Sequence, residues 1–151
     1  MKKYFYLFII TFVVSSCSDN PTTGEVSYQN SEILVTNEYG VILGGDYSDW
    51  CMSDTGGFLR NGFGPAYPNP AEITFHVPFS LPVASEVDMY FTSGIDTLFV
   101  LNGESLVAGH YSITIATGQY PFQNVIKKLY FISRGTDGGV FRCEGDVKFV
   151  N

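Results

Sequence analysis

Apolar and polar residues alternate along much of the chain with the two-residue period of a half-buried β-strand. The alternation is clear around Val87, Met89 and Phe91, which are separated by Asp88 and Tyr90. The pattern therefore predicts strands whose core-facing residues are Ile73, Phe75, Val77; Val87, Met89, Phe91; Tyr111, Ile113, Ile115; Leu129, Phe131; and Val147, Phe149.

Turn-forming residues separate these predicted strands. They are Tyr67-Pro68-Asn69-Pro70, Ser93-Gly94, Asn102-Gly103, Ala108-Gly109 and Thr136-Asp137-Gly138-Gly139. No segment after position 17 has the periodicity of an amphipathic helix. Short strands with no helices between them predict an all-β protein, built as an antiparallel sandwich or barrel.

The N-terminus has a different pattern, with two lysines followed by an uncharged, mostly apolar run from Tyr4 to Val14. Eleven helical residues span only about 16 Å, roughly half of a hydrocarbon core. The run is therefore too short for a permanent membrane span and has the length of a signal-peptide core. The sequence that follows, Val14-Ser15-Ser16-Cys17, resembles the lipobox of bacterial lipoproteins.

The lipobox resemblance implies that residues 1–16 are removed and that Cys17 is acylated. Several acyl chains give stable membrane anchoring where a single chain is marginal. Because Ser18 stands where the inner-membrane retention pattern carries Asp, we expect an outer-membrane lipoprotein, facing the periplasm or the cell surface. Residues 17–31 are polar and predict a flexible tether. Residues 32–62 are then an N-terminal extension that packs on a sandwich of residues 63–151.

Composition restricts the class of protein further. Charged residues make up 15% of the 151 residues, and the net charge is −7. If residues 1–16 are removed, the net charge becomes −9, since both lost charges are lysines. A hydrophobic share of 45% excludes a disordered chain, and the scarcity of Lys and Arg excludes a nucleic-acid partner. From Cys17 onward, 49 of 135 residues are β-branched or aromatic, which agrees with an all-β domain.

A second resemblance covers roughly residues 66–150. The segments are Ala66-Tyr67-Pro68-Asn69-Pro70, Ile73-Thr74-Phe75, Leu81-Pro82, Glu86-Val87-Asp88-Met89-Tyr90, Gly94 and Leu106-Val107-Ala108-Gly109-His110-Tyr111-Ser112-Ile113. Together they look like the immunoglobulin-like domain shared by flagellar hook-capping proteins and the C-terminal sorting modules of type IX secretion cargo. Lys128-Leu129-Tyr130-Phe131 resembles a later aromatic strand of that family. The resemblance implies an immunoglobulin/fibronectin-III-like sandwich of about seven strands.

Two cysteines remain once Cys17 is assigned to the lipid. Cys51 and Cys143 form an even pair in a compartment that is oxidising, so we expect a disulfide between them. Two free buried thiols are the alternative. The chain has no CxxC motif and no four-ligand Cys/His set, so neither redox catalysis nor a zinc site is expected.

Other candidate sites are sparse. Asp46, Asp49 and Asp54 lie in one oxygen-rich segment and form a weak candidate for calcium, although acidic turns are common. His76 and His110 fall on predicted outer faces, and we interpret them as surface histidines. No nucleotide-binding, hydrolase or metalloprotease motif occurs. We therefore expect neither an enzyme nor a cofactor.

Aromatic residues reach 16% of the chain, and most are expected to pack in the core. Those in loop-like segments are candidates for ligand binding, namely Tyr47, Trp50, Tyr120 and Phe122. The sequence thus predicts a lipid-anchored envelope protein with a non-catalytic interaction or structural domain. An accessory carbohydrate-binding lipoprotein that uses loop aromatics is the alternative. The protein or glycan partner is left open.

Overall fold

The computed structural model describes residue 28 and residues 31–51 and 62–150, and the regular secondary structure of these residues is almost entirely β-strand. The predicted signal peptide and most of the tether lie outside the described residues. The strands are β1 (Val35–Thr36), β2 (Ile42–Gly44), β3 (Gly62–Phe63), β4 (Thr74–Leu81), β5 (Ser85–Ser93), β6 (Asp96–Leu106), β7 (Gly109–Ala116), β8 (Val125–Gly135) and β9 (Val140–Phe149). One short 3₁₀ helix, η1 (Thr117–Gln119), follows β7.

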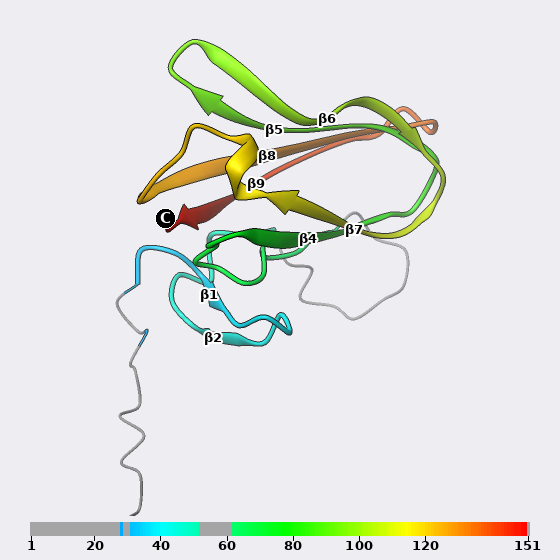
Figure 1. Ribbon diagram of the computed structural model, residues 1–151. Helices are drawn as coiled ribbons and strands as arrows, with labels where there is room; N and C mark the ends of the chain where they lie inside the picture. The colour runs from blue at the N-terminus through cyan, green and yellow to red at the C-terminus, as the bar shows by residue number, and fades with distance from the viewer. Residues whose placement is uncertain (1–27, 29–30, 52–61, 151) are drawn as a thin grey trace, which may run out of the picture.

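Seven of these strands form two facing antiparallel sheets, which confirms the predicted all-β sandwich. One sheet has the order β3-β4-β7 and the other the order β6-β5-β8-β9. Figure 1 shows the four-stranded sheet lying over β4 and β7. A separate two-stranded sheet, β1-β2, raises the total to nine, and it lies on the side of β4 away from the four-stranded sheet (Figure 1).

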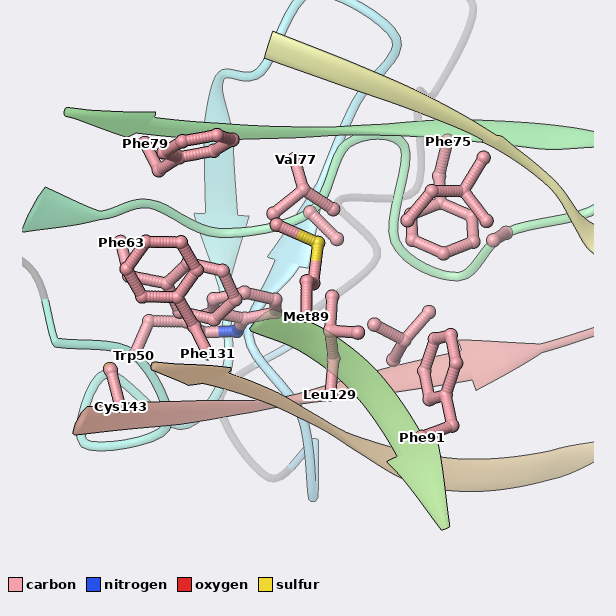
Figure 2. Close-up of a cluster of buried hydrophobic side chains, with 14 of the residues drawn as sticks. Trp50, Phe63, Phe75, Val77, Phe79, Met89, Phe91, Leu129, Phe131 and Cys143 are labelled. Atoms are coloured by element: carbon pink, nitrogen blue, oxygen red, sulfur yellow. The ribbon is translucent and has the colours of Figure 1, made fainter. Parts of the chain in front are cut away.

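The core fills the space between the two sheets with the residues that the alternation predicts. Phe75 and Val77 of β4 and Met89 of β5 are fully buried (Figure 2). Leu129 and Phe131 of β8 and Val147 and Phe149 of β9 are buried with them. Most of the phenylalanines contact another ring in the core, with Phe63 stacked on Phe131 at 4.9 Å between centroids.

Two details of the predicted pattern are wrong. Ile73 is 73% exposed, because β4 begins only at Thr74. Two residues before Ile73, Ala71 forms a bridge with Phe149 of β9 instead of extending β4. Asn102-Gly103 does not end a strand but lies inside β6, where the register with β5 is irregular after Val87. Gly103 adopts a φ of 63°, which glycine tolerates at a β-bulge, and β6 continues beyond it to Leu106.

The segment from residue 31 to residue 51, which we call the N-terminal segment, packs along the edge of the sandwich formed by β3 and β9. Thr36 exchanges backbone hydrogen bonds with Asn69, at 3.0 and 3.3 Å. Gly40 lies against the ring of Tyr67, which in turn lies over His76 on the outer face of β4. The N-terminal segment ends at Trp50 and Cys51, which contact the sandwich itself.

Candidate interaction sites

Trp50 closes the edge of the sandwich between β3 and β9. Its side chain is only 4% exposed, and its ring lies 5.1 Å from that of Phe63 (Figure 2). On the β9 side the ring covers Gly145, where even a Cβ atom would overlap it. Burial of so large a ring makes Trp50 part of the core.

The next residue, Cys51, is joined to Cys143 of β9 by a disulfide with an S–S distance of 2.02 Å. This confirms the predicted pairing and excludes two free thiols. The bond spans 92 positions and ties the N-terminal segment to the last strand.

The four loop aromatics do not form one exposed surface. The predictions for Trp50 and Phe122 as exposed binding rings are wrong, because Phe122 is 2% exposed and packs against Phe91 and Phe149. Both rings come from loop-like segments, but each packs against core rings, Trp50 against Phe63 and Phe122 against Phe91 and Phe149. Tyr120 is half-buried and stacks on Phe122, and burial raises the pKa of its hydroxyl. Tyr47 alone of the four is largely exposed, at 61%.

The two described residues of the calcium candidate point to different partners. Asp46 accepts hydrogen bonds from the backbone and hydroxyl of Ser48, at 2.9 and 2.6 Å, and these bonds lower its pKa. Asp49 faces Asp146 of β9 instead. Asp54 lies outside the described residues. Within the described part of the chain, no group of three His, Cys, Asp or Glu side chains could hold a metal ion.

The carboxyl groups of Asp49 and Asp146 form a close acidic pair. Partial burial, followed by the charge and the hydrogen bond of Asp146, raises the pKa of Asp49 to about 6. Lys128 of β8 supplies the neighbouring positive charge, with its Nζ 2.7 Å from Glu144 and 3.7 Å from Asp146. The pair therefore takes up a proton as the pH falls to about 6, next to Trp50.

Asn69 is a buried polar residue whose role the sequence did not reveal. Its Nδ2 donates to the carbonyls of Leu34 and Asp146, at 3.0 and 2.9 Å, and its Oδ1 accepts from the Lys148 amide at 3.0 Å. The side chain thus joins the N-terminal segment to β9. The Tyr67-Pro68-Asn69-Pro70 motif predicted a turn, but no local pattern indicates which distant carbonyls the amide meets.

A row of rings crosses the outer face of the four-stranded sheet and was also missed. Tyr90 of β5 stacks on Tyr130 of β8 at 5.3 Å, and Phe99 of β6 lies 5.7 Å from Tyr90 on the other side. Phe99 is 46% exposed. A cavity of about 360 Å³ adjoins the row, lined by Tyr90, Tyr130, Ile132, Arg142 and Glu144 among others. The available signal was Tyr90 itself, an aromatic residue in the polar phase of its strand.

Ion pairs flank these rings. Arg134 of β8 contacts Asp88 at 2.7 Å and Glu86 at 3.2 Å, while Lys128 contacts Glu144. These five side chains are between 14% and 54% exposed, so solvent partly screens their charges. The outer face therefore combines stacked rings with charged hydrogen-bonding groups.

The two histidines lie on the outer face of the three-stranded sheet, as predicted. The Nδ1 of His76 is 2.9 Å from the hydroxyl of Thr114 on the neighbouring strand. His110 is exposed near the start of β7 and pairs in register with Ser80. The two side chains therefore occupy separate positions along adjacent strands.

Two further findings bear on function. No helix within the described ranges is long and apolar enough to cross a membrane. In the comparisons with known proteins, the chain matches no family model, no curated protein and no solved structure.

Proposed function

We propose that this chain is a lipid-anchored protein of the cell envelope whose β-sandwich binds a partner and does not catalyse a reaction. The observation that carries the proposal is the sequence Val14-Ser15-Ser16-Cys17 after a short apolar run. The disulfide between Cys51 and Cys143 supports it, because such bonds persist in compartments outside the cytoplasm. The resemblance to immunoglobulin-like domains of envelope and secretion proteins also favours a binding role.

The polar groups of the sandwich support binding over catalysis. Asn69 joins the N-terminal segment to β9, and the pair of Asp49 and Asp146 lies at the same contact. Arg134 and Lys128 are engaged in ion pairs on an open sheet face. A catalytic site needs a nucleophile and a base converging on one cavity. Arg134 and Lys128 instead join β8 to its neighbours β5 and β9, and Asn69 joins the N-terminal segment to β9.

The lipid anchor is tested by Cys17→Ala in the full chain expressed in a Gram-negative host. We expect this variant to lose palmitate labelling and its place in the membrane fraction, since Cys17 is the proposed acylation site. Ser15→Ala is the matched control, because it keeps a small residue ahead of the cysteine, and it should keep both. Continued labelling of Cys17→Ala would contradict the proposal.

The outer-membrane location has a separate test. Ser18→Asp would create the inner-membrane retention pattern directly after the lipidated cysteine. We expect the variant to move from the outer-membrane to the inner-membrane fraction in a density gradient, while its lipidation is unchanged. An unchanged distribution would argue that the second residue does not direct this protein.

Glycan binding is the second candidate function, and the row formed by Phe99, Tyr90 and Tyr130 favours it. Aromatic rings beside charged hydrogen-bonding groups suit the apolar faces and hydroxyls of sugars. Phe99 offers the most exposed ring, because Tyr90 and Tyr130 stack on each other. A glycan array probed with the wild type and with Phe99→Ala tests this, with Tyr39→Ala as a control at an exposed ring outside the row. Signals that do not change in Phe99→Ala would contradict it.

A further inference from the structure

The strand β7 forms one end of the three-stranded sheet and pairs with β4 along its other side. Its register with β4 is continuous over eight residue pairs, from Thr74–Ala116 to Leu81–Gly109. In the part of the chain that the structure describes, no strand pairs with the outer edge of β7.

The backbone bonds of β4 show which groups of β7 face that outer edge. The carbonyl of Pro78 accepts from Gly64 at 2.8 Å, and His76 exchanges hydrogen bonds with Tyr67 at 2.8 and 2.9 Å. Both residues therefore direct their backbone groups toward β3 and away from β7. Since Pro78 pairs with Ser112 and His76 with Thr114, each pair is of the non-hydrogen-bonded kind. The backbone N–H and C=O of Ser112 and Thr114 consequently point outward from the sheet.

The other sheet edges carry features that prevent further pairing, whereas β7 does not. The β3 edge is only two residues long. The β9 edge is covered at one end by Ala71, whose amide donates to Lys148 at 2.8 Å. The β6 edge has an irregular register and carries Asp96 and Glu104. By contrast, β7 reads Gly-His-Tyr-Ser-Ile-Thr-Ile-Ala, without proline, lysine, arginine or a carboxylate.

The side chains along this edge are incompletely covered. Tyr111 and Ile113 face the core from β7 but are only half-buried, whereas Phe75 and Val77 on β4 are fully buried. Val107, which precedes β7, is 71% exposed. An added strand with apolar side chains at every second position would cover this side of the core.

The negative charge near the β7 edge favours a basic strand from a partner protein over a second copy of this acidic chain. The chain is acidic, and β6 forms the edge of the facing sheet on the same side of the sandwich, because β3 and β9 meet at the opposite side. A second copy would bring another Asp96 and Glu104 to this side. A strand flanked by Lys or Arg would find complementary charge there.

We propose that β7 binds an extended segment of a partner protein by strand addition. The segment alternates aliphatic with small polar residues and is flanked by basic residues. This proposal rests on the binding role proposed above but not on the lipid anchor, so the Cys17→Ala experiment and the following one fail independently.

The probe is a capped peptide of alternating Thr and Val residues with Lys at both ends, added to the full chain purified in mild detergent. Fluorescence polarisation of the labelled peptide measures affinity, and hydrogen exchange measures protection of residues 109–116. We expect binding together with slower exchange in this segment. Ser112→Pro removes an outward N–H that β4 does not use, and proline is tolerated at such edge positions. It should weaken binding by about tenfold or more.

Ser112→Ala is the matched control, because it keeps the backbone donor and should bind within about twofold of the wild type. Circular dichroism and Tm show whether each variant is folded. N-methylation of alternate peptide amides tests the same bonds with the protein unchanged. A peptide that does not bind, or that binds Ser112→Pro and the wild type equally, overturns the proposal. A dimer seen by light scattering without peptide, and abolished by Ser112→Pro, overturns it in favour of a second copy.

Discussion

At the scale of single residues, Asn69 gives the sharpest prediction. It is fully buried, and its amide makes three hydrogen bonds that join Leu34 to Asp146 and Lys148. Asn69→Leu keeps the branched shape of the side chain but leaves these three backbone groups without their partner. We expect a loss of about 3–5 kcal/mol in the free energy of unfolding, since each unsatisfied buried group costs about 1–3 kcal/mol and the costs are not additive.

Urea denaturation measures this loss. Asn102→Ala is the control, because Asn102 is exposed on β6 and its replacement should change the free energy of unfolding by no more than about 0.5 kcal/mol. If the two variants were equally stable, the amide of Asn69 would not be a structural link.

The pair of Asp49 and Asp146 predicts an unusual pH dependence. The pKa of Asp49 is about 6 in the folded chain, above its ordinary value of 3.8. The folded state therefore binds more protons than the unfolded state between these two values. This group's contribution to stability is present at low pH and is lost as the pH rises through about 6.

Asp49→Asn tests this dependence. An amide at this position can still accept from the Leu34 backbone and donate to Asp146, and it carries no charge to be neutralised. We expect the Tm of the variant to exceed that of the wild type by a few degrees near pH 8, and we expect this difference to shrink as the pH falls below about 6 and to vanish below the ordinary value of 3.8. Thermal melts across this range measure the effect, and a constant difference between the two proteins would contradict it.

At the scale of elements, the contact between the N-terminal segment and β9 depends on one small residue. The ring of Trp50 lies where a side chain at Gly145 would be. Gly145→Ala should force the ring or the strand to move and cost about 1–3 kcal/mol, as overpacking does in other cores. Gly118→Ala is the control, because the space beside Gly118 is open and its φ is not positive. Chemical denaturation of both variants compares them, and equal stability would show that the Trp50 ring shifts without cost.

The strands themselves were largely predictable from the sequence, and their ends were not. Alternation identified the buried residues of β5, β8 and β9, because a two-residue period is a property of the strand alone. Ile73 broke the pattern because Ala71 pairs with a strand about eighty positions away. The sequence predicts Trp50 and Phe122 as exposed loop rings, because burial of a loop ring against a distant strand leaves no local signal. Tyr90 did leave one, as an aromatic residue on a polar strand face.

At the scale of the whole molecule, the two sides of the sandwich differ in how they are closed. The N-terminal segment covers the β3 and β9 side. It is attached there by the buried ring of Trp50, by the disulfide and by the hydrogen bonds of Asn69. The β6 and β7 side has no such cover among the described residues, and Tyr111 and Ile113 are half-buried there. Ser31, the last residue of the predicted tether, lies near Lys148 of β9 on the covered side. The open side would therefore be available to a partner.

The disulfide should stabilise the fold, while the packing of Trp50 should be enough to make the N-terminal segment and the sandwich unfold together. The loop-entropy model gives about 4–5 kcal/mol for a bond spanning this many residues, so Cys51→Ser should lower the Tm by about 10 °C or more. Trp50 is the single tryptophan of the chain, and its emission therefore reports on the N-terminal segment alone, while far-ultraviolet circular dichroism reports on the strands. Because Trp50 packs between Phe63 of β3 and Gly145 of β9, we expect the two signals to change in one transition in both proteins. Wild-type protein treated with reductant should reproduce the lower Tm of Cys51→Ser. If the Trp50 emission of Cys51→Ser shifted to the red at a temperature well below the loss of the strand signal, the N-terminal segment would be a separate unit that the disulfide holds to the sandwich.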